Sequence, residues 1–270
     1  MKTVVVAPSC TLNRQAAERV QRIAAQRGDC ELLVHPQCFL TDGHFAGSDA
    51  ERLTALREVM ADPSVDAVWF ARGGYGSNRI AEAAIEGLPV EAFTKTYLGY
   101  SDAGFLLAGF HKAGLTVAHG PMAQDVLRDG GDAAVSRALD WLCSGDSAAL
   151  EPSLSGPAFA FNLTVLSNLL GTPLEPDLSR AELLLEEVSE HFYRIDRTMF
   201  HITASANVRS VRQIRLGRVS DVPANDPEFG VDAAAIVADW CARSGIPFGG
   251  HADIGHDVDN RVVPFGSSRD

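Results

Sequence analysis

Cysteine is scarce in this sequence, and no two cysteines stand in a pattern that would use them together. Five occur among 270 residues, an odd number, widely scattered and never as C-x-x-C: Cys10, Cys30, Cys38, Cys143 and Cys241. A disulfide framework or a structural zinc site needs cysteines in pairs at defined spacings. We therefore expect free thiols, as in a reducing compartment, and predict a cytoplasmic location.

Long apolar runs are absent as well. The first residues, MKTVVVAPSC, contain one lysine and a short apolar run that is broken by Pro8. Such a run is too short for the apolar region of a secretory signal and is typical of a first strand. No stretch approaches the roughly 20 apolar residues that a membrane span requires. We expect a soluble protein without a membrane partner.

Positive charge is in deficit. The chain has 23 Lys and Arg against 35 Asp and Glu, a formal net charge of −12. Acidic residues outnumber basic ones both in residues 1–145 and in residues 146–270. Binding to nucleic acid depends on a basic surface that displaces counterions from phosphates. The composition therefore excludes nucleic acid as the expected partner.

Strand and helix patterns alternate through the first half of the chain. Apolar runs predict strands at 3–8, 31–36, 65–71, 95–100 and 116–122, and amphipathic patterns predict helices at 14–28, 49–63, 79–86, 101–114 and 133–145. Strands that are apolar throughout are typical of a parallel sheet covered on both faces, which makes this an α/β fold. Right-handed crossovers place the carboxyl ends of the strands at one edge, where such sheets bind ligands.

A break in this pattern separates the two halves. Residues 146–157 are rich in Gly, Ser and Pro, and we predict a linker there between a first domain at 1–145 and a second at 158–270. The second part is mixed, with predicted strands at 181–188, 211–219 and 260–266 and helices at 193–204 and 231–245.

The sharpest local motif is LGYSDAG (98–104), in which a predicted strand ends, Ser101 occupies a turn and a helix begins. This is the pattern of the nucleophile elbow, G-x-S-x-G, with Ala103 in the last place. There the backbone N–H of Asp102 would face an oxyanion near the positive end of the helix dipole. The alternative is that Ser101 only caps the helix, the commonest use of serine before a helix.

A glycine-rich stretch, ARGGYGSN (71–78), follows another predicted buried strand. Gly73 and Gly74 let the backbone approach a ligand closely and turn its amides inward. The loop could cradle a phosphate, although it matches neither G-x-G-x-x-G nor the P-loop. Alternatively, it supplies the second amide of an oxyanion hole.

Histidines and aspartates crowd the loop GGHADIGHDVDN (249–260). A divalent metal site is one interpretation, because these side chains suit zinc and similar ions. The other is a single catalytic imidazole, from His251 or His256, surrounded by solvated acids. No cluster elsewhere supplies a matching pair of ligands.

Two glutamates end the apolar run AELLLEEV (181–188). Successive strand residues face opposite sides, so Glu186 and Glu187 cannot serve one site together. An acid in so apolar a run needs a partner. A catalytic histidine would provide one, and Arg194 or Arg197 is the alternative.

Taken together, these segments resemble the LD-carboxypeptidase family, cytoplasmic serine peptidases that trim muropeptides in cell-wall recycling. The family also includes the microcin C self-immunity peptidases. The matching stretches follow the family's order along most of the chain: RGGYGSNR (72–79), LGYSDAG (98–104), HGPM (119–122), LLGTPLEPDL (169–178), LLLEEVSEHFYRIDR (183–197) and GHDVDNRVVPFG (255–266).

The resemblance implies a catalytic triad of Ser101, Glu186 and His256, with oxyanion donors at the amides of Asp102, Gly73 and Gly74. His256 keeps the family's Gly-His pair. In the family P-F-G usually runs directly into that histidine, whereas here GHADI intervenes and leaves His251 nearest to P-F-G. His119 is expected to be structural.

The resemblance also implies an architecture and an activity. A Rossmann-like parallel-sheet domain would carry the serine, and a β-rich, swivelling barrel-like domain would carry the glutamate and the histidine. The implied enzyme is a metal-independent serine carboxypeptidase without a cofactor. It would release C-terminal D-alanine from muropeptide tetrapeptides, and it would form a homodimer. Arg72 and Arg197 are the candidates for binding the substrate carboxylate.

Two other functions remain open at this point. Within the same family, the chain could be an immunity peptidase that cuts an acyl-sulfamoyl adenylate or a related amide. In a different class, it could be a Rossmann-like nucleotide-binding module in which the glycine-rich loop holds a phosphate and Ser101 only caps a helix.

Overall fold

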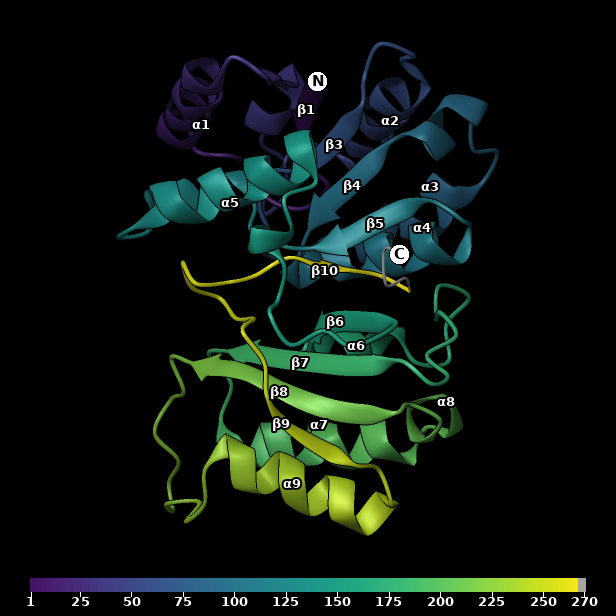
Figure 1. The fold of residues 1–270 in the computed structure, drawn as a ribbon, viewed down its shortest axis with the longest axis vertical. Coiled ribbons are helices and arrows are strands. Elements are labelled where there is room, and N and C mark those ends of the chain that lie inside the picture. Colours follow the sequence, from purple (N-terminus) through teal and green to yellow (C-terminus); the bar gives the residue numbers. More distant parts are fainter. Residues whose placement is uncertain (267–270) are drawn as a thin grey trace.

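Two sheets, one above the other along the long axis of the molecule, organise the chain (Figure 1). The computed structural model describes residues 1–266, so the last four residues of the expected second domain, 267–270, lie outside the described residues. Both sheets are mostly parallel and carry helices, which confirms the mixed α/β class. Within the described residues no helix is both long and apolar enough to cross a membrane.

The first sheet has six strands in the order β10-β5-β4-β3-β1-β2. Five of them are parallel and correspond to the five strands predicted in the first half. Their bounds are β1 (Lys2–Val6), β2 (Glu31–Val34), β3 (Ala67–Phe70), β4 (Thr96–Gly99) and β5 (Thr116–His119). The interior strand β3 is buried along its whole length, as the apolar pattern requires.

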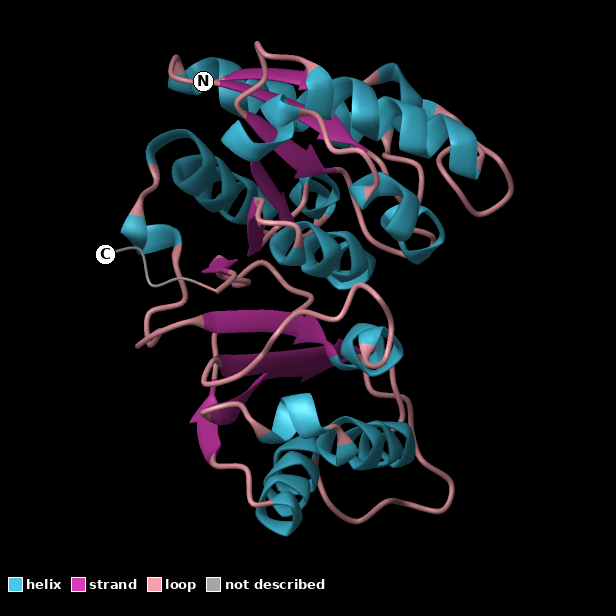
Figure 2. Cartoon of the chain, turned by 90° about the vertical axis from the view of Figure 1, so that its right-hand side faces the viewer, coloured by secondary structure: helices cyan, strands magenta, loops and turns pink. Residues whose placement is uncertain are grey.

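Helices cover both faces of this sheet (Figure 2): α1 (Arg14–Arg27), α2 (Asp49–Ala61), α3 (Asn78–Ile85), α4 (Gly104–Lys112) and α5 (Gly131–Ser144). Alternate residues of β1 point to opposite faces, so Val5 packs in the cluster that contains α1 and α5, and Val4 in that of α2, α3 and α4. Local signals fix the helix ends. Ser48 and Glu51 form a capping box at the start of α2, and α1 ends at Gly28 in the left-handed conformation.

The second sheet is parallel, with the order β6-β7-β8-β9, and its helices lie on one side (Figure 2). Its strands are β6 (Ala158–Asn162), β7 (Glu182–Val188), β8 (Gln213–Ser220) and β9 (Phe248–His251), and its helices are α6 (Leu163–Leu169), α7 (Phe192–Ala204), α8 (Ala206–Arg209) and α9 (Ala233–Ser244). Among the described residues β9 does not pair with β6. The barrel-like shape that we expected for this part is therefore an open sheet.

The last strand returns to the first sheet. β10 (Val263–Pro264) pairs antiparallel with β5, so that Val263 lies opposite His119. In Figure 1 this segment runs between the two sheets. The sequence predicts a strand at 260–266 but not its partner, and the second half of the chain thus completes the sheet of the first half.

The predicted linker contacts both the segment before β10 and a buried charged group of the second sheet. Leu150 bridges to Val262, and the buried Glu151 accepts a hydrogen bond of 2.8 Å from Arg215 on β8. Arg215 also pairs with the buried Glu182 at 3.4 Å. A buried guanidinium between two carboxylates is rigidly specified, because loss of any partner leaves an uncompensated charge. Residues 146–157 are therefore a fixed connection and not a loose tether.

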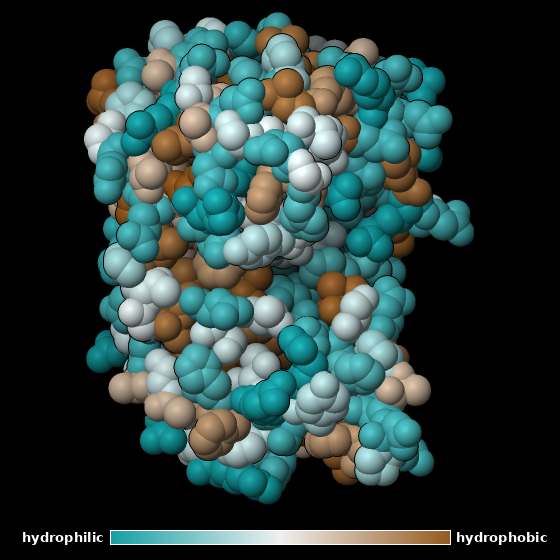
Figure 3. Space-filling view, turned by 180° about the vertical axis from the view of Figure 1, so that it is seen from behind, coloured by the Kyte–Doolittle hydropathy of each residue, from teal (hydrophilic) through white to brown (hydrophobic). Residues whose placement is uncertain are grey.

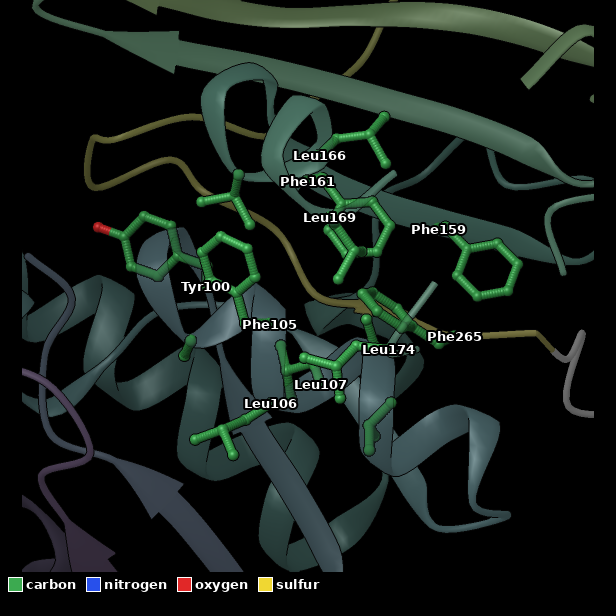
Figure 4. Close-up of a cluster of buried hydrophobic side chains, with 14 of the residues drawn as sticks. Tyr100, Phe105, Leu106, Leu107, Phe159, Phe161, Leu166, Leu169, Leu174 and Phe265 are labelled. Carbon is green, nitrogen blue, oxygen red and sulfur yellow. The ribbon is translucent and has the colours of Figure 1, made fainter. Parts of the chain in front are cut away.

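Apolar side chains of both halves share one core (Figure 4). Phe105, Leu106 and Leu107 of α4 lie in the same cluster as Phe161 of β6 and Phe265 beside β10, whose rings are 5.1 Å apart. Glycines on α4 allow the approach, since a Cβ at Gly104 would lie 3.0 Å from Val165 and one at Gly109 2.8 Å from Leu174. The surface is hollowed where the two halves meet (Figure 3).

Candidate active site

Ser101 stands at the carboxyl edge of the first sheet. β4 ends at Gly99, residues 101–103 form a 3-10 turn and α4 begins at Gly104. Ser101 has φ of 57°, in the left-handed region that non-glycine residues avoid, and such strain is typical of a nucleophile elbow. The residue at the N-cap of α4 is Ala103, and the Ser101 hydroxyl faces His256. The alternative of a capping serine is therefore wrong.

Ser101, His256 and Glu186 form a continuous hydrogen-bonded chain. Nε2 of His256 lies 3.0 Å from Oγ of Ser101, and Nδ1 of the same ring lies 2.6 Å from Oε2 of Glu186. The Glu186 side chain is completely buried, and that of His256 is 10% exposed. The structure thus brings together the three residues that the family resemblance selects, from positions up to 155 residues apart. Their order is that of a nucleophile, a base and an acid that orients the base.

Two opposing effects set the pKa of His256. Burial of the ring favours its neutral form, but the charge of Glu186 and the hydrogen bond from Nδ1 favour the imidazolium and outweigh it. The pKa of His256 therefore lies above its ordinary value of 6.5. A raised pKa suits a group that accepts a proton from an alcohol and returns it to a leaving amine.

The alternation of β7 turns its two glutamates to different partners, as predicted, but both lie at the Ser101 site, because Glu187 lines a hollow that Ser101 also borders. Glu186 faces His256, while Glu187 accepts hydrogen bonds from Nδ2 of Asn162 at 2.6 Å and from the hydroxyl of Thr164 at 2.8 Å. Burial raises the pKa of Glu187. Neither arginine weighed as a partner reaches Glu186, because Arg194 pairs with Glu190 and Arg197 lies over the ring of Tyr193.

The loop that carries His256 is fixed from two sides. Oδ1 of Asn260 accepts from the backbone N–H of Gly255 at 3.2 Å and lies 3.0 Å from Nε2 of His119. His119 is fully buried, which lowers its pKa to about 4, so it is a neutral structural residue as expected. On the other side, Arg218 of β8 pairs with Asp257 and Asp253.

The side chains that a metal ion in this loop would use already have other partners. Asp253 and Asp257 point to a guanidinium, and His256 is committed to Ser101 and Glu186. Within residues 1–266 no three His, Cys, Asp or Glu side chains are grouped as a metal site would require. His251 lies apart from Ser101, on β9, with its side chain exposed and its carbonyl accepting from Arg215.

The glycine-rich loop lies directly against the serine. A Cβ placed on Gly73 would be 2.7 Å from Oγ of Ser101, closer than any side chain could come. The carboxylate of Asp102, buried beside Ser101, binds this loop by accepting from the backbone N–H of Ser77 at 2.8 Å. The Ser77 hydroxyl donates in turn to the carbonyl of Asp102. Asp102 therefore holds the serine turn and the glycine loop in register.

That contact also bears on the phosphate-cradle interpretation. Ser77 precedes α3, and its N–H is one that a phosphate at this helix start would use. In the structure Asp102 already occupies it. The loop is thereby directed to Ser101, where its glycines keep space open beside the hydroxyl.

Two hollows meet at Ser101. The larger, about 650 Å³, extends between α3, α4 and α6, and Glu82, Glu187 and Glu190 are among its lining residues. The smaller, about 300 Å³, is lined by the ring of His256 and by Arg72 and Arg128. Ser101 and Gly74 border both, so a bound molecule can pass across the hydroxyl from one hollow to the other.

Family models match both halves of the chain. The N-terminal domain of the LD-carboxypeptidases matches residues 4–120, and the C-terminal domain matches residues 155–269. The chain belongs to the LD-carboxypeptidase family. A Synechocystis relative that bears the name of a carboxypeptidase is 34% identical over 233 residues, covering 83% of this chain and 76% of the relative. The murein tetrapeptide carboxypeptidase of Pseudomonas aeruginosa is 28% identical over 246 residues, covering 83% of this chain and 78% of that protein.

Solved structures agree with this assignment. The muramoyltetrapeptide carboxypeptidase of Oxalobacter formigenes superposes with a TM-score of 0.84 at 25% identity, covering 98% of this chain and 93% of that one. A microcin C7 self-immunity protein in complex with aspartyl sulfamoyl adenosine gives 0.81 at 18% identity, covering 98% and 91%. The second likeness shows a shared fold.

Several residues that shape this LD-carboxypeptidase site have no signal in the sequence. Asn260 is one asparagine in a polar loop, and its role depends on β10 placing it beside His119. Gly217 of β8 is another, because a Cβ there would lie 3.1 Å from Cβ of Glu186 and 2.6 Å from the carbonyl of Ile254. Only the pairing of β7 with β8 reveals that need.

Substitution of Gly73 by alanine is expected to reduce kcat by about 100-fold or more, because the methyl group would occupy the space beside Oγ of Ser101. Its φ is not in the left-handed region, so the backbone suits alanine, but the Ser101 side chain must shift to admit the methyl group. The measurement is kcat on a muropeptide tetrapeptide together with urea denaturation. Wild-type kcat in the variant would show that the loop does not border the reacting atoms.

Proposed function

We propose that this protein is a metal-independent serine carboxypeptidase that hydrolyses the L,D-peptide bond before the C-terminal D-alanine of muropeptide tetrapeptides during cell-wall recycling. The observation that carries the proposal is the chain from Oγ of Ser101 through His256 to the buried Glu186, placed where two hollows meet. The names of the Pseudomonas and Oxalobacter relatives supply the substrate class.

The mechanism follows from these contacts. Nε2 of His256 takes the hydroxyl proton as Oγ of Ser101 attacks the carbonyl carbon, and Glu186 holds Nδ1–H and stabilises the imidazolium. The tetrahedral intermediate collapses when His256 gives that proton to the departing amine, which leaves as D-alanine. Water, deprotonated by the same imidazole, then attacks the acyl-enzyme and restores Ser101 with release of the shortened peptide.

The oxyanion of each intermediate needs donors that are in place before the reaction. We assign them to the backbone N–H groups of Asp102 and of the Gly73–Gly74 segment. Support comes from the contact of Gly73 with Ser101 and from the hydrogen bonds by which Asp102 fixes the loop. The start of α4, just beyond Ser101, adds its dipole.

The test is incubation of the purified protein with a tetrapeptide that ends in D-alanine, with and without EDTA. We expect release of D-alanine that EDTA does not reduce, and labelling of Ser101 by a fluorophosphonate probe. Release that is lost with EDTA would contradict a metal-independent reaction. Failure of the folded protein to release D-alanine from the tetrapeptide would contradict the substrate.

An immunity-type peptidase is the second candidate, because the microcin C7 protein shares the fold. An aspartyl sulfamoyl adenosine added to the same assay distinguishes the two. A nucleotide-binding module has less support, since Asp102 holds the loop that would cradle the phosphate.

Organisation and location belong to the same proposal. We divide the chain into domains at 1–145 and 158–270 with a linker at 146–157, supported by the bounds of the two family matches. The cytoplasmic location is supported by the five free cysteines. The homodimer rests on the family resemblance.

A further inference from the structure

The direction in which a peptide lies across Ser101 follows from the position of His256. A departing amine must reach Nε2 of this ring to receive its proton, within about 3 Å or through one water. The ring of His256 lines the smaller hollow and is not among the residues that line the larger one. The leaving D-amino acid therefore occupies the smaller hollow, and the acyl part of the peptide occupies the larger.

The volumes and charges of the hollows agree with that direction. About 300 Å³ suffices for one small amino acid, while about 650 Å³ accommodates a longer acyl part. The larger hollow is lined by three glutamates and by no lysine or arginine, so it disfavours a carboxylate. The smaller hollow is lined by Arg72, Arg128 and one carboxylate, Asp125, so its charged side chains sum to a positive charge that favours a carboxylate.

The two arginines differ in what they already bind. Nε of Arg128 donates to Oδ1 of Asp125 at 3.0 Å, and Asp125 is held further by the hydroxyl of Tyr100 and the N–H of Met122. Arg72 makes one long hydrogen bond, 3.4 Å, to the carbonyl of Thr11. Within residues 1–266 no carboxylate lies within 4.0 Å of its guanidinium. Arg72 is thus half-buried at the carboxyl end of β3 with its charge uncompensated.

We infer that Arg72 binds the C-terminal carboxylate of the substrate and thereby selects peptides whose scissile bond precedes a free C-terminal amino acid. The inference rests on the proposed function for its substrate. The planar fork of the guanidinium can pair with both carboxylate oxygens, and an amide or a continuing chain at that position lacks the charge that the fork requires. Arg72 is a specificity-determining residue, distinct from the three residues that perform the chemistry.

The test compares one tetrapeptide as the free acid with the same tetrapeptide amidated at its C-terminus. Wild type should prefer the acid. Arg72→Gln should lower kcat/KM for the acid by about 10- to 100-fold, mostly through KM, and change that for the amide by less than about threefold. Arg72→Lys keeps the charge but not the fork and should recover part of the loss. The matched control is Arg22→Gln, an exposed arginine of α1 outside both hollows, which should alter neither rate.

Equal losses on acid and amide in Arg72→Gln, or no loss on either, would overturn the inference and leave the proposed function intact. Should wild type cleave neither peptide, the proposed function fails, and binding decides about Arg72 separately. In that case titration calorimetry on Ser101→Ala should show tighter binding of the acid than of the amide, and Ser101→Ala with Arg72→Gln should remove the difference. Equal affinities for Ser101→Ala would overturn the inference.

Discussion

Replacement of Ser101 by alanine is expected to lower kcat for D-alanine release by about 10⁶-fold, the loss seen when the nucleophile of a serine protease triad is removed. Without Oγ there is no acyl-enzyme, and His256 has no proton to accept. The fold should remain, since the side chain makes its described hydrogen bond only with His256. The measurement is D-alanine release over long incubation, with labelling by a fluorophosphonate probe lost in parallel.

Two further variants, Ser167→Ala and Ser101→Gly, separate the effect on catalysis from the effect on stability. Ser167→Ala removes an exposed hydroxyl that contacts His201 and should leave the rate unchanged. Ser101→Gly should be as inactive as Ser101→Ala but about 1 kcal/mol more stable in urea denaturation, because glycine adopts a φ of 57° without strain. Retention of more than about 1% of wild-type kcat in Ser101→Ala would contradict the assignment of the nucleophile.

Substitution of Glu186 by glutamine is expected to reduce kcat by about 10⁴-fold, as loss of the buried acid does in serine proteases. The change should also move the pH dependence. His256 must be neutral to accept the proton, and its raised pKa places the acidic limb of kcat/KM above pH 6.5 in wild type. Without the charge of Glu186, burial dominates, the pKa of His256 falls and the limb moves to lower pH.

The measurement is a pH profile of kcat/KM for both proteins. Glu187→Gln is the informative comparison, because Glu187 is the adjacent buried glutamate but binds Asn162 and Thr164 on the other side of β7. Its removal should move the limb less than Glu186→Gln does. A limb that stays in place in Glu186→Gln would show that another group sets the pKa of the base.

Local sequence patterns were sufficient to predict the five parallel strands of the first sheet. The interior strand β3 is apolar along its whole length, the start of α2 has a capping box that the sequence displays, and Ser101 follows directly from a strand that runs into a helix. The second sheet was predicted less completely. β6 (AFAFN) passes into α6 at Asn162 with no loop between them, and β9 (FGGH) has two glycines among four residues, so local patterns delimit neither strand clearly.

The site required more than patterns. The residues alone left Glu186 and His256 among several alternatives, and the family resemblance chose between them. What no local pattern contains is long-range pairing: the contact of Asn260 with His119, the space beneath Glu186 at Gly217, and the return of the chain to β5. Each depends on residues more than 30 positions apart, whose meeting is decided by packing of the whole molecule.

The antiparallel strand β10 also determines when the enzyme can first exist during its synthesis. The ribosome synthesises the five parallel strands of the first sheet before β10, so the edge of β5 stays unpaired until residues 263 and 264 have emerged. His256, held by the segment that ends in this strand, reaches Ser101 no sooner. Until residues 263 and 264 have emerged, the nascent chain therefore keeps one open sheet edge and lacks the strand that follows the His256 loop.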